Sequence, residues 1–311
     1  MKKIKERGIT LVALVVTIII LLILAGISLG MVTSGNGILG RAKNAANLYR
    51  DSAATENNTL NNYASAIKKA YDDTSKVSKS TPFVGYYADT DKDGNIDGII
   101  YADLAIGNTG SGSWQNEPYS IPVENKNDLK DYYISKSSYK FNDAFGEKPV
   151  LSPLNSGKNR FYIMTLTDFS TVINNYKMDR FTWYLSANSF MKDFSSTTSD
   201  SFGAGKSNTQ NIIKKFTNSA YGNQSNGDIL KYLSSLSANG WFLPSLKEWI
   251  AFEGELVKTT SYSSCSSFGL QWGYWTSTQA TESYVWDIYP GIGKHQASVT
   301  NSDYVRFSKT F

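Results

Sequence analysis

The sequence predicts an α+β protein in which a long N-terminal helix precedes a globular region of mixed helices and strands. No charged residue lies between Gly8 and Gly40, and an apolar run of about 20 residues spans a membrane as a helix. Beyond residue 81, short segments typical of strands are interspersed with amphipathic helical segments. We therefore divide the chain into a leader and apolar helix (1–33), a helical stalk and linker (34–80) and a globular region (81–311).

The composition favours a secreted or surface protein over a cytosolic enzyme. Hydrophobic residues make up 41% of the 311 residues, which allows a large core, and only 19% are charged. Part of the net charge of +4 lies in the first seven residues, so the rest of the chain is near neutral. It has no basic stripe that would indicate a nucleic-acid partner. The single cysteine, Cys265, excludes an internal disulfide, and nothing near the single histidine, His295, resembles a nucleophile motif. We predict no catalytic residues.

The N-terminus carries a basic head, formed by Lys2, Lys3, Lys5 and Arg7, before its apolar run. Basic residues stay on the cytoplasmic side of a membrane, so we expect the rest of the chain outside, at the cell surface. The basic leader, Gly8 and the apolar "ITLVALVVTIII" resemble the N-terminus of type IV pilins and pseudopilins. The resemblance implies cleavage by a prepilin peptidase between Gly8 and Ile9. A plain signal anchor is the alternative.

One position departs from the pilin pattern. Pilins usually carry a glutamate at the fifth mature position, where this chain has Ala13. The departure favours a monomeric membrane anchor over filament assembly. After an interruption at "TSGNG" (33–37), helical spacing predicts a second helix over residues 38–73, followed by a polar linker over 72–81.

An acidic loop, "DTDKDGNIDG", places carboxylates at alternate positions and a glycine at the sixth place. This pattern wraps a chain around Ca²⁺, which takes roughly six to eight oxygen ligands. An EF-hand would have a glutamate at its twelfth place, where this chain has Ile100, so we expect a loop between two strands instead. A solvated acidic turn is the alternative. The candidate ligands are Asp89, Asp91, Asp93, Asn95 and Asp97, with Asp103 as a further oxygen donor.

The middle of the chain predicts strands over 131–141 and 160–166 and short helices over 209–216 and 227–236. "GAGKSNT" (203–209) lacks the spacing and the preceding strand of a phosphate-binding loop. Nearer the end, Ser245 and Glu248 form a capping box that begins a helix. Three strands are expected after it, over 274–279, 284–290 and 304–311.

The ending resembles a known fold. "GWFLPSLKEW", "YWTSTQ", a central "VW" and a closing "YVR" resemble the C-type-lectin-like fold in the branch that contains the formylglycine-generating enzyme. More narrowly, residues 239–311 resemble the variable proteins of diversity-generating retroelements, in which a reverse transcriptase rewrites the end of the gene. With the anchor and the acidic loop, the chain resembles a recurrent architecture of gut Gram-positive bacteria. The resemblance implies a scaffold of Trp275, Trp286, Val299, Tyr304 and Val305, with changeable exposed positions between them.

The residues between these scaffold positions supply amphipathic aromatics and adaptable hydrogen-bonding groups, as antibody loops do. We predict that they bind a ligand; a tolerant surface without a partner is the alternative. The candidate positions are Trp272, Tyr274, Tyr284, Asp287, Tyr289, Ile292, Lys294, His295, Gln296, Ser298, Thr300, Asn301, Ser302 and Asp303.

The expected function is therefore a surface-anchored, non-enzymatic protein that captures a protein or glycan ligand. A minor pilin or pseudopilin that associates with other pilins is the alternative. An oxidase of the formylglycine-generating branch would need cysteine pairs or copper-binding cysteines, and Cys265 stands alone. The Glu-Pro-Asn type of calcium motif that sugar-binding lectins use is absent from the sequence, so a lectin-like fold would not by itself imply sugar binding.

Overall fold

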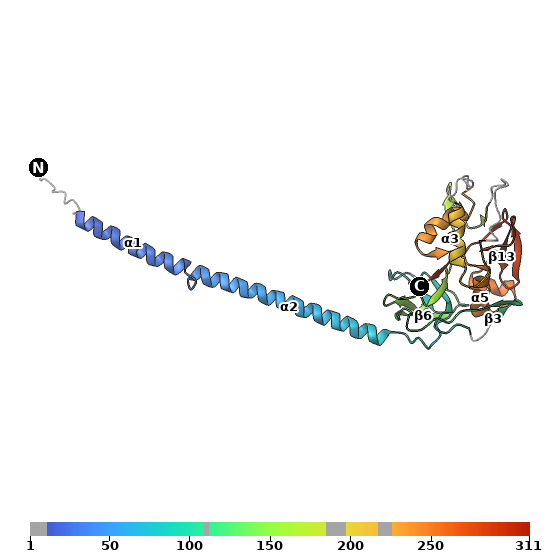
Figure 1. Cartoon of the computed structure of the whole chain (residues 1–311), viewed down its shortest axis with the longest axis horizontal. Helices are drawn as coiled ribbons and strands as arrows, with labels where there is room; N and C mark the ends of the chain where they lie inside the picture. The colour runs from blue at the N-terminus through green and yellow to red at the C-terminus, as the bar shows by residue number, and fades with distance from the viewer. Residues whose placement is uncertain (1–10, 109–111, 185–196, 217–225) are drawn as a thin grey trace. The chain divides into compact units, whose positions relative to one another are not determined.

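The computed structural model describes residues 11–108, 112–184, 197–216 and 226–311, and it divides the chain into two compact units, Met1–Tyr71 and Asp72–Phe311 (Figure 1). The first unit is helical, and the second combines strands with shorter helices. The predicted α+β class is therefore confirmed. The predicted processing residues, Gly8 and Ile9, lie outside the described residues.

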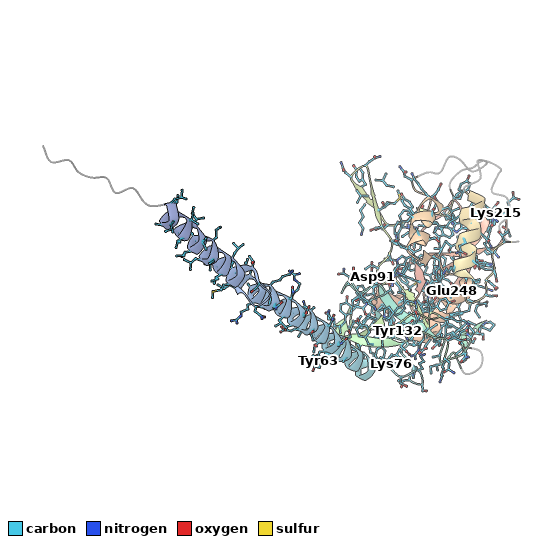
Figure 2. All side chains as sticks on the ribbon, turned by 60° about the vertical axis from the view of Figure 1, so that its left-hand side comes forward. Tyr63, Lys76, Asp91, Tyr132, Lys215 and Glu248 are labelled. Carbon is cyan, nitrogen blue, oxygen red and sulfur yellow. The ribbon has the colours of Figure 1, made fainter. Side chains whose placement is uncertain are left out.

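The first unit contains α1 (Leu11–Thr33) and most of α2 (Ile38–Ser75). The predicted interruption between them is a tight turn. A Cβ atom on Gly37 would lie 2.4 Å from the carbonyl oxygen of Met31, so only glycine fits there. The segment Leu11–Ile67 contains an apolar stretch long enough to cross a membrane, and none of it is buried. Side chains of α2 such as Tyr63 project outward (Figure 2).

The segment expected to be a linker belongs to the second unit. Val77 is buried, and its backbone N–H donates to the carbonyl of Tyr132 at 2.8 Å. The ammonium groups of Lys76 and Lys79 lie 2.6 and 3.2 Å from the carboxylate of Asp131. Residues 76–79 are thus fixed to the globular unit by a buried apolar residue and two ion pairs.

The second unit contains a seven-stranded sheet in its described part. The chain's last strand lies inside this sheet, between two strands from earlier in the sequence, so the C-terminus is part of the fold. Only the pairing of β1 with β6 is parallel. The strand order is β11 (Trp241–Phe242), β16 (Ser308–Thr310), β7 (Phe161–Met164), β2 (Gly98–Asp103), β1 (Tyr87–Ala88), β6 (Glu147–Pro153) and β5 (Tyr132–Lys140).

Helices and hairpins surround this sheet. The Ser245 hydroxyl accepts from the Glu248 N–H and the Glu248 carboxylate accepts from the Ser245 N–H, which confirms the predicted capping box. In Figure 1, α5 and β3 lie close together, and Trp114 of β3 donates to Glu253 at 2.8 Å. The helical segments are α3 (Gly205–Phe216), α4 (Leu230–Ala238), α5 (Leu246–Phe252), η2 (Glu253–Val257), α6 (Tyr262–Cys265) and η3 (Ser266–Phe268).

Short two-stranded pairs complete the unit: β3 (Gly112–Trp114) with β4 (Glu117–Tyr119), β8 (Thr171–Ile173) with β9 (Tyr176–Met178), and β10 (Phe181–Thr182) with β15 (Ser302–Asp303). One apolar core contains Trp249 and Tyr274, and another contains Trp275 and Val305. The backbone N–H groups of Gly203 and Gly205 donate to Glu248 at 3.1 and 3.4 Å. This glycine segment therefore holds a buried carboxylate.

Two expectations about the ending differ from the structure. A strand was expected over 304–311, but β16 covers only Ser308–Thr310; the Phe307 N–H before it donates to the side-chain hydroxyl of Thr165 at 3.2 Å instead of to a backbone carbonyl. The strand β14 (Gly293–Ser298) was not expected, because "GKHQAS" lacks the apolar alternation that marks a strand.

Candidate binding face

A three-stranded antiparallel sheet carries most of the predicted binding residues: β12 (Tyr274–Gln279), β13 (Tyr284–Tyr289) and β14. The register pairs Asp287 with His295 and Tyr284 with Ser298. Successive side chains of a strand point to opposite sides, so Asp287 and Tyr289 share one side of β13. The label β13 in Figure 1 marks this sheet.

Most of the predicted positions reach the surface. Trp272 and Tyr284 are each 45% exposed and Ile292 is 55% exposed, which is unusual for large apolar side chains. Tyr289 and Ser298 are partly exposed. By the strand register, Tyr284, Lys294, Gln296 and Ser298 lie on one side of the sheet, and Tyr289 and His295 lie on the other. We use the name C-terminal face for all the exposed and partly exposed positions together: Trp272, Tyr284, Tyr289, Ile292, Lys294, His295, Gln296, Ser298, Thr300, Asn301 and Ser302.

Three predicted binding residues are buried. Tyr274 has no exposed surface; its ring packs against Trp249 at 4.7 Å and its hydroxyl donates to Asp168 at 2.8 Å. The expectation that Tyr274 contacts a ligand is therefore wrong, because β12 is buried along its whole length. Asp287 and Asp303 are also buried, at 0% and 5% exposure, so they lie beneath the face instead of on it.

A chain of aromatic contacts connects one side of the face. The rings of Tyr262 and Trp272 are 4.6 Å apart, those of Trp272 and Tyr289 are 5.2 Å apart, and Tyr289 and His295 are 5.3 Å apart. These edge-to-face contacts fix the orientation of the exposed rings. Sequence reasoning missed Tyr262, because it lies in a polar loop without any periodic signal.

A different set of contacts holds Lys294. Its ammonium group lies 2.7 Å from Glu117 and 4.9 Å from the ring centroid of Trp286. Lys247 contacts the same carboxylate at 2.8 Å. Burial acts to raise the pKa of Glu117, but hydrogen bonds from the two lysines outweigh it and lower that pKa. Sequence reasoning missed Glu117, which is distant from Lys294 in the chain.

The two acidic residues beneath the face have few partners. Asp287 Oδ1 lies 3.2 Å from His295 Nδ1, and Asp303 Oδ1 lies 3.9 Å from an Arg180 nitrogen. The second oxygen of each carboxylate has no hydrogen-bond partner among the described residues. Burial raises the pKa of Asp287 to about 6. Burial, together with the charge of Asp287, raises the pKa of Asp303 to about 7.

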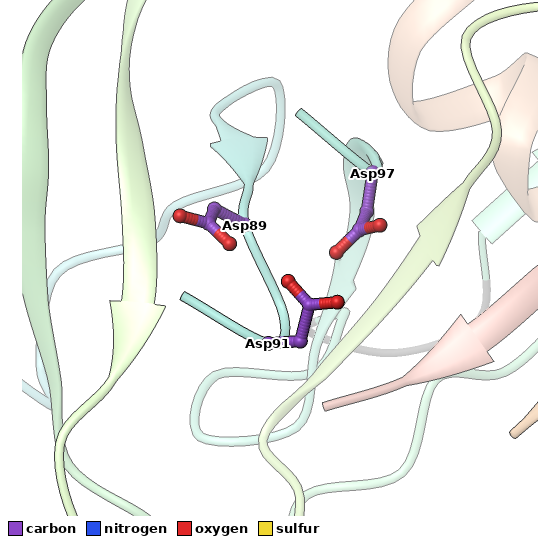
Figure 3. A group of neighbouring side chains, drawn as sticks. All are labelled: Asp89, Asp91 and Asp97. Carbon is purple, nitrogen blue, oxygen red and sulfur yellow. The ribbon is translucent and has the colours of Figure 1, made fainter. Parts of the chain in front are cut away.

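The acidic loop lies between β1 and β2, which confirms that it joins two strands. Oxygens of Asp89, Asp91 and Asp97 lie within 4.8 Å of one another, and the three carboxylates point toward one another (Figure 3). Burial and the charges of Asp97 and Asp91 raise the pKa of Asp89, against hydrogen bonds from the backbone N–H groups of Gly94 and Lys92 that lower it. A shared cation would relieve this repulsion.

The other predicted ligands of this loop lie differently. Asp93 is exposed and accepts hydrogen bonds from the backbone and the side-chain amide of Asn95, both at 2.8 Å. Asp103 was expected to supply a further oxygen, and that expectation is wrong. Both of its oxygens accept from Arg160 at 2.8 Å, in a buried ion pair.

A cleft lies elsewhere in the second unit. Two adjoining cavities of about 410 and 480 Å³ share Phe141, Leu166, Thr167 and Asp168 in their walls. Arg306 lies in the wall of the smaller one. None of the predicted binding residues lines either cavity.

Comparison with known proteins adds little to this geometry. No family model and no curated protein matches the chain. The structure of a fimbrial protein from Bacteroides ovatus ATCC 8483 is similar in part, with a TM-score of 0.30 and 13% identity over 66% of this chain. The matched region covers 49% of the fimbrial protein, about half of its length. A TM-score of 0.30 is too low to establish a shared fold, so the function is inferred from this chain's own geometry.

Proposed function

We propose that the chain is a membrane-anchored surface protein that binds a protein or glycan ligand through its C-terminal face. The observation that carries the proposal is the exposure of large aromatic and apolar side chains: Tyr284 on β13, Trp272 just before β12 and Ile292 just before β14. A few exposed aromatic anchors commonly supply most of the binding energy of an interface. We propose no chemical step at this face.

A C-type-lectin-like fold and a diversified ending are part of the proposal. Of the residues that the resemblance treats as scaffold, Trp275, Val299 and Val305 are buried, and Trp286 and Tyr304 are partly buried. Exposed positions lie between them. Such a division supports a scaffold that tolerates replacement of its surface residues without loss of the core.

The anchor is inferred from the first unit. The side chains of α1 are exposed, and most of them are apolar, with no charged residue along the helix; a bilayer would cover them. We propose that the basic head stays in the cytoplasm, that a prepilin peptidase cuts after Gly8, and that the second unit is extracellular.

We also propose that Asp89, Asp91 and Asp97 hold a structural Ca²⁺. Three carboxylates within 4.8 Å of one another supply hard oxygen ligands. The ion would fix the loop that joins β1, a strand of only two residues, to β2.

A minor pilin or pseudopilin is the second candidate. The observation that favours it is the exposure of apolar residues along α2, including Leu48, Tyr49 and Ile67. Packing against other copies or other pilins would bury them.

Selection from a random peptide library and from a glycan array tests the binding proposal, using the full chain in detergent micelles. We expect the wild-type protein to select ligands, and we expect Trp272→Ala with Tyr289→Ala to lose them. Tyr176→Ala is the matched control, because Tyr176 is 80% exposed but lies on β9, outside the face. Equal loss in the control, or no selected ligand on either platform, would contradict the proposal.

A further inference from the structure

Two buried carboxylates beneath the C-terminal face lack the partners that buried charges normally have. Asp287 is 0% exposed and Asp303 is 5% exposed. Each has one oxygen without a hydrogen-bond partner in the part of the chain that the structure describes. An unpaired buried carboxylate is costly, so a pair of them in one place calls for an explanation.

The charged groups around this pair satisfy it incompletely. His295 approaches Asp287 with one nitrogen at 3.2 Å, and its side chain is 56% exposed. Arg180 stays 3.9 Å from Asp303, beyond hydrogen-bond distance, and instead donates to the carbonyl of Ser302. The two carboxylates interact electrostatically with each other.

Aromatic rings lie beside the same pair. Asp287 and Tyr289 lie two residues apart on one side of β13, and burial, then the charges of Asp287 and Asp303, raise the pKa of the Tyr289 hydroxyl. Tyr289 in turn contacts Trp272 at 5.2 Å and His295 at 5.3 Å. Rings of this kind attract a cation over their faces. Carboxylates and exposed aromatic rings together favour a positively charged ligand group.

We propose that Asp287 and Asp303 receive a basic side chain of a protein ligand, with Tyr289 and Trp272 packing along its stem. This inference rests on the proposed binding function and names its ligand class. The guanidinium group of arginine fits best, because its planar fork donates to several oxygens at once. The two oxygens without partners are available as acceptors for such a fork.

A single metal ion fits the site less well. Among the described residues, only Asp89, Asp91 and Asp97 bring three potential ligand atoms within 4.8 Å of one another. The atoms of Asp287, His295 and Asp303 therefore do not converge on one point. An extended guanidinium group spans separated acceptors, whereas an ion needs them around a common centre.

Entry of the basic group requires a small displacement. Both unpartnered oxygens are buried, so a side chain above them must move. His295 is the candidate, since it is exposed and its imidazole makes one hydrogen bond to Asp287. Rotamer changes of exposed side chains commonly accompany binding.

A random peptide library tests this inference with the full chain in detergent micelles. The variant D287N/D303N keeps the shape of both side chains and removes their charge. The matched control D128N/D143N makes the same change at two exposed aspartates in the loops that flank β5. We expect wild type and control to select peptides enriched in arginine or lysine, and we expect D287N/D303N to lose that enrichment.

A second measurement does not depend on how the variant folds. In the best selected peptide, arginine is replaced by citrulline, which has nearly the same shape without the charge. We expect wild-type affinity to fall at least tenfold, as for loss of one partner of a buried charge pair. Selected peptides without basic enrichment, or an unchanged affinity for citrulline, would overturn the inference and leave the binding function standing. Selection of neither peptides nor glycans would overturn both.

Discussion

Replacing Asp103 with alanine should strongly destabilise the second unit. The two oxygens of Asp103 accept from Nε and Nη2 of Arg160 at 2.8 Å each, and the two side chains are 1% and 0% exposed. Arg160 also donates to the carbonyls of Ser78 and Thr81 at 3.1 and 2.9 Å. The pair therefore fastens residues 78–81 to β2, and the alanine variant leaves a buried guanidinium without its anion.

The expected effect is large. Breaking a buried ion pair from one side costs about 3–5 kcal/mol. For a folded unit of this size, about 1 kcal/mol shifts the melting temperature by roughly 2–4 °C. We therefore expect the melting temperature of Asp103→Ala to fall by roughly 6–20 °C.

Thermal unfolding of the full chain in detergent, followed by near-ultraviolet circular dichroism, measures this shift. Asp143→Ala is the control, because Asp143 forms an ion pair with Lys140 but its side chain is 94% exposed; such a pair should contribute little. The double variant D103L/R160M should recover part of the loss, since apolar residues can replace a buried pair. If the two alanine variants melt at the same temperature, the reasoning about this ion pair is refuted.

Three further predictions concern pH, calcium and processing. Burial raises the pKa of Glu253 to about 7, against hydrogen bonds from Trp114 and Gly291. Its stabilising contribution is complete below pH 4.5 and is lost as pH rises toward 7. Chemical denaturation should therefore show that the free energy of unfolding of wild type falls between pH 5 and pH 7.5. In Glu253→Gln this fall should be smaller by about 1–3 kcal/mol. Equal slopes against pH in the two proteins would contradict this. Calcium at about 100 times its dissociation constant should stabilise wild type by about 2.7 kcal/mol but not Asp91→Asn, and a melting temperature insensitive to chelator would exclude the site. Mass spectrometry of the mature chain should find Ile9 at its N-terminus, and a retained Met1 would exclude prepilin processing.

Local signals in the sequence predicted those elements whose formation depends on neighbouring residues. The capping box of Ser245 and Glu248 begins α5 as expected, because its hydrogen bonds join residues three apart. The acidic loop lies between two strands as expected, since Asp and Gly favour a turn.

The predictions that were wrong or absent concern residues whose environment is set by contacts between distant segments of the chain. Tyr274 was expected at the surface, but its exposure is set by Trp249 and Asp168, which no local pattern reveals. Asp103 was expected to be a metal ligand of the acidic loop, but both of its oxygens accept hydrogen bonds from Arg160. The contact of Glu117 with Lys294 likewise joins segments far apart in the chain.

Deep sequencing of the 3′ end of this gene, within one population of cells that carries it, tests the central claim most directly. A diversified binding face predicts substitutions at positions such as Tyr289, His295 and Asn301, while the buried Trp275 and Arg306 stay constant. A uniform ending, or substitutions spread equally over buried and exposed positions, would contradict the claim.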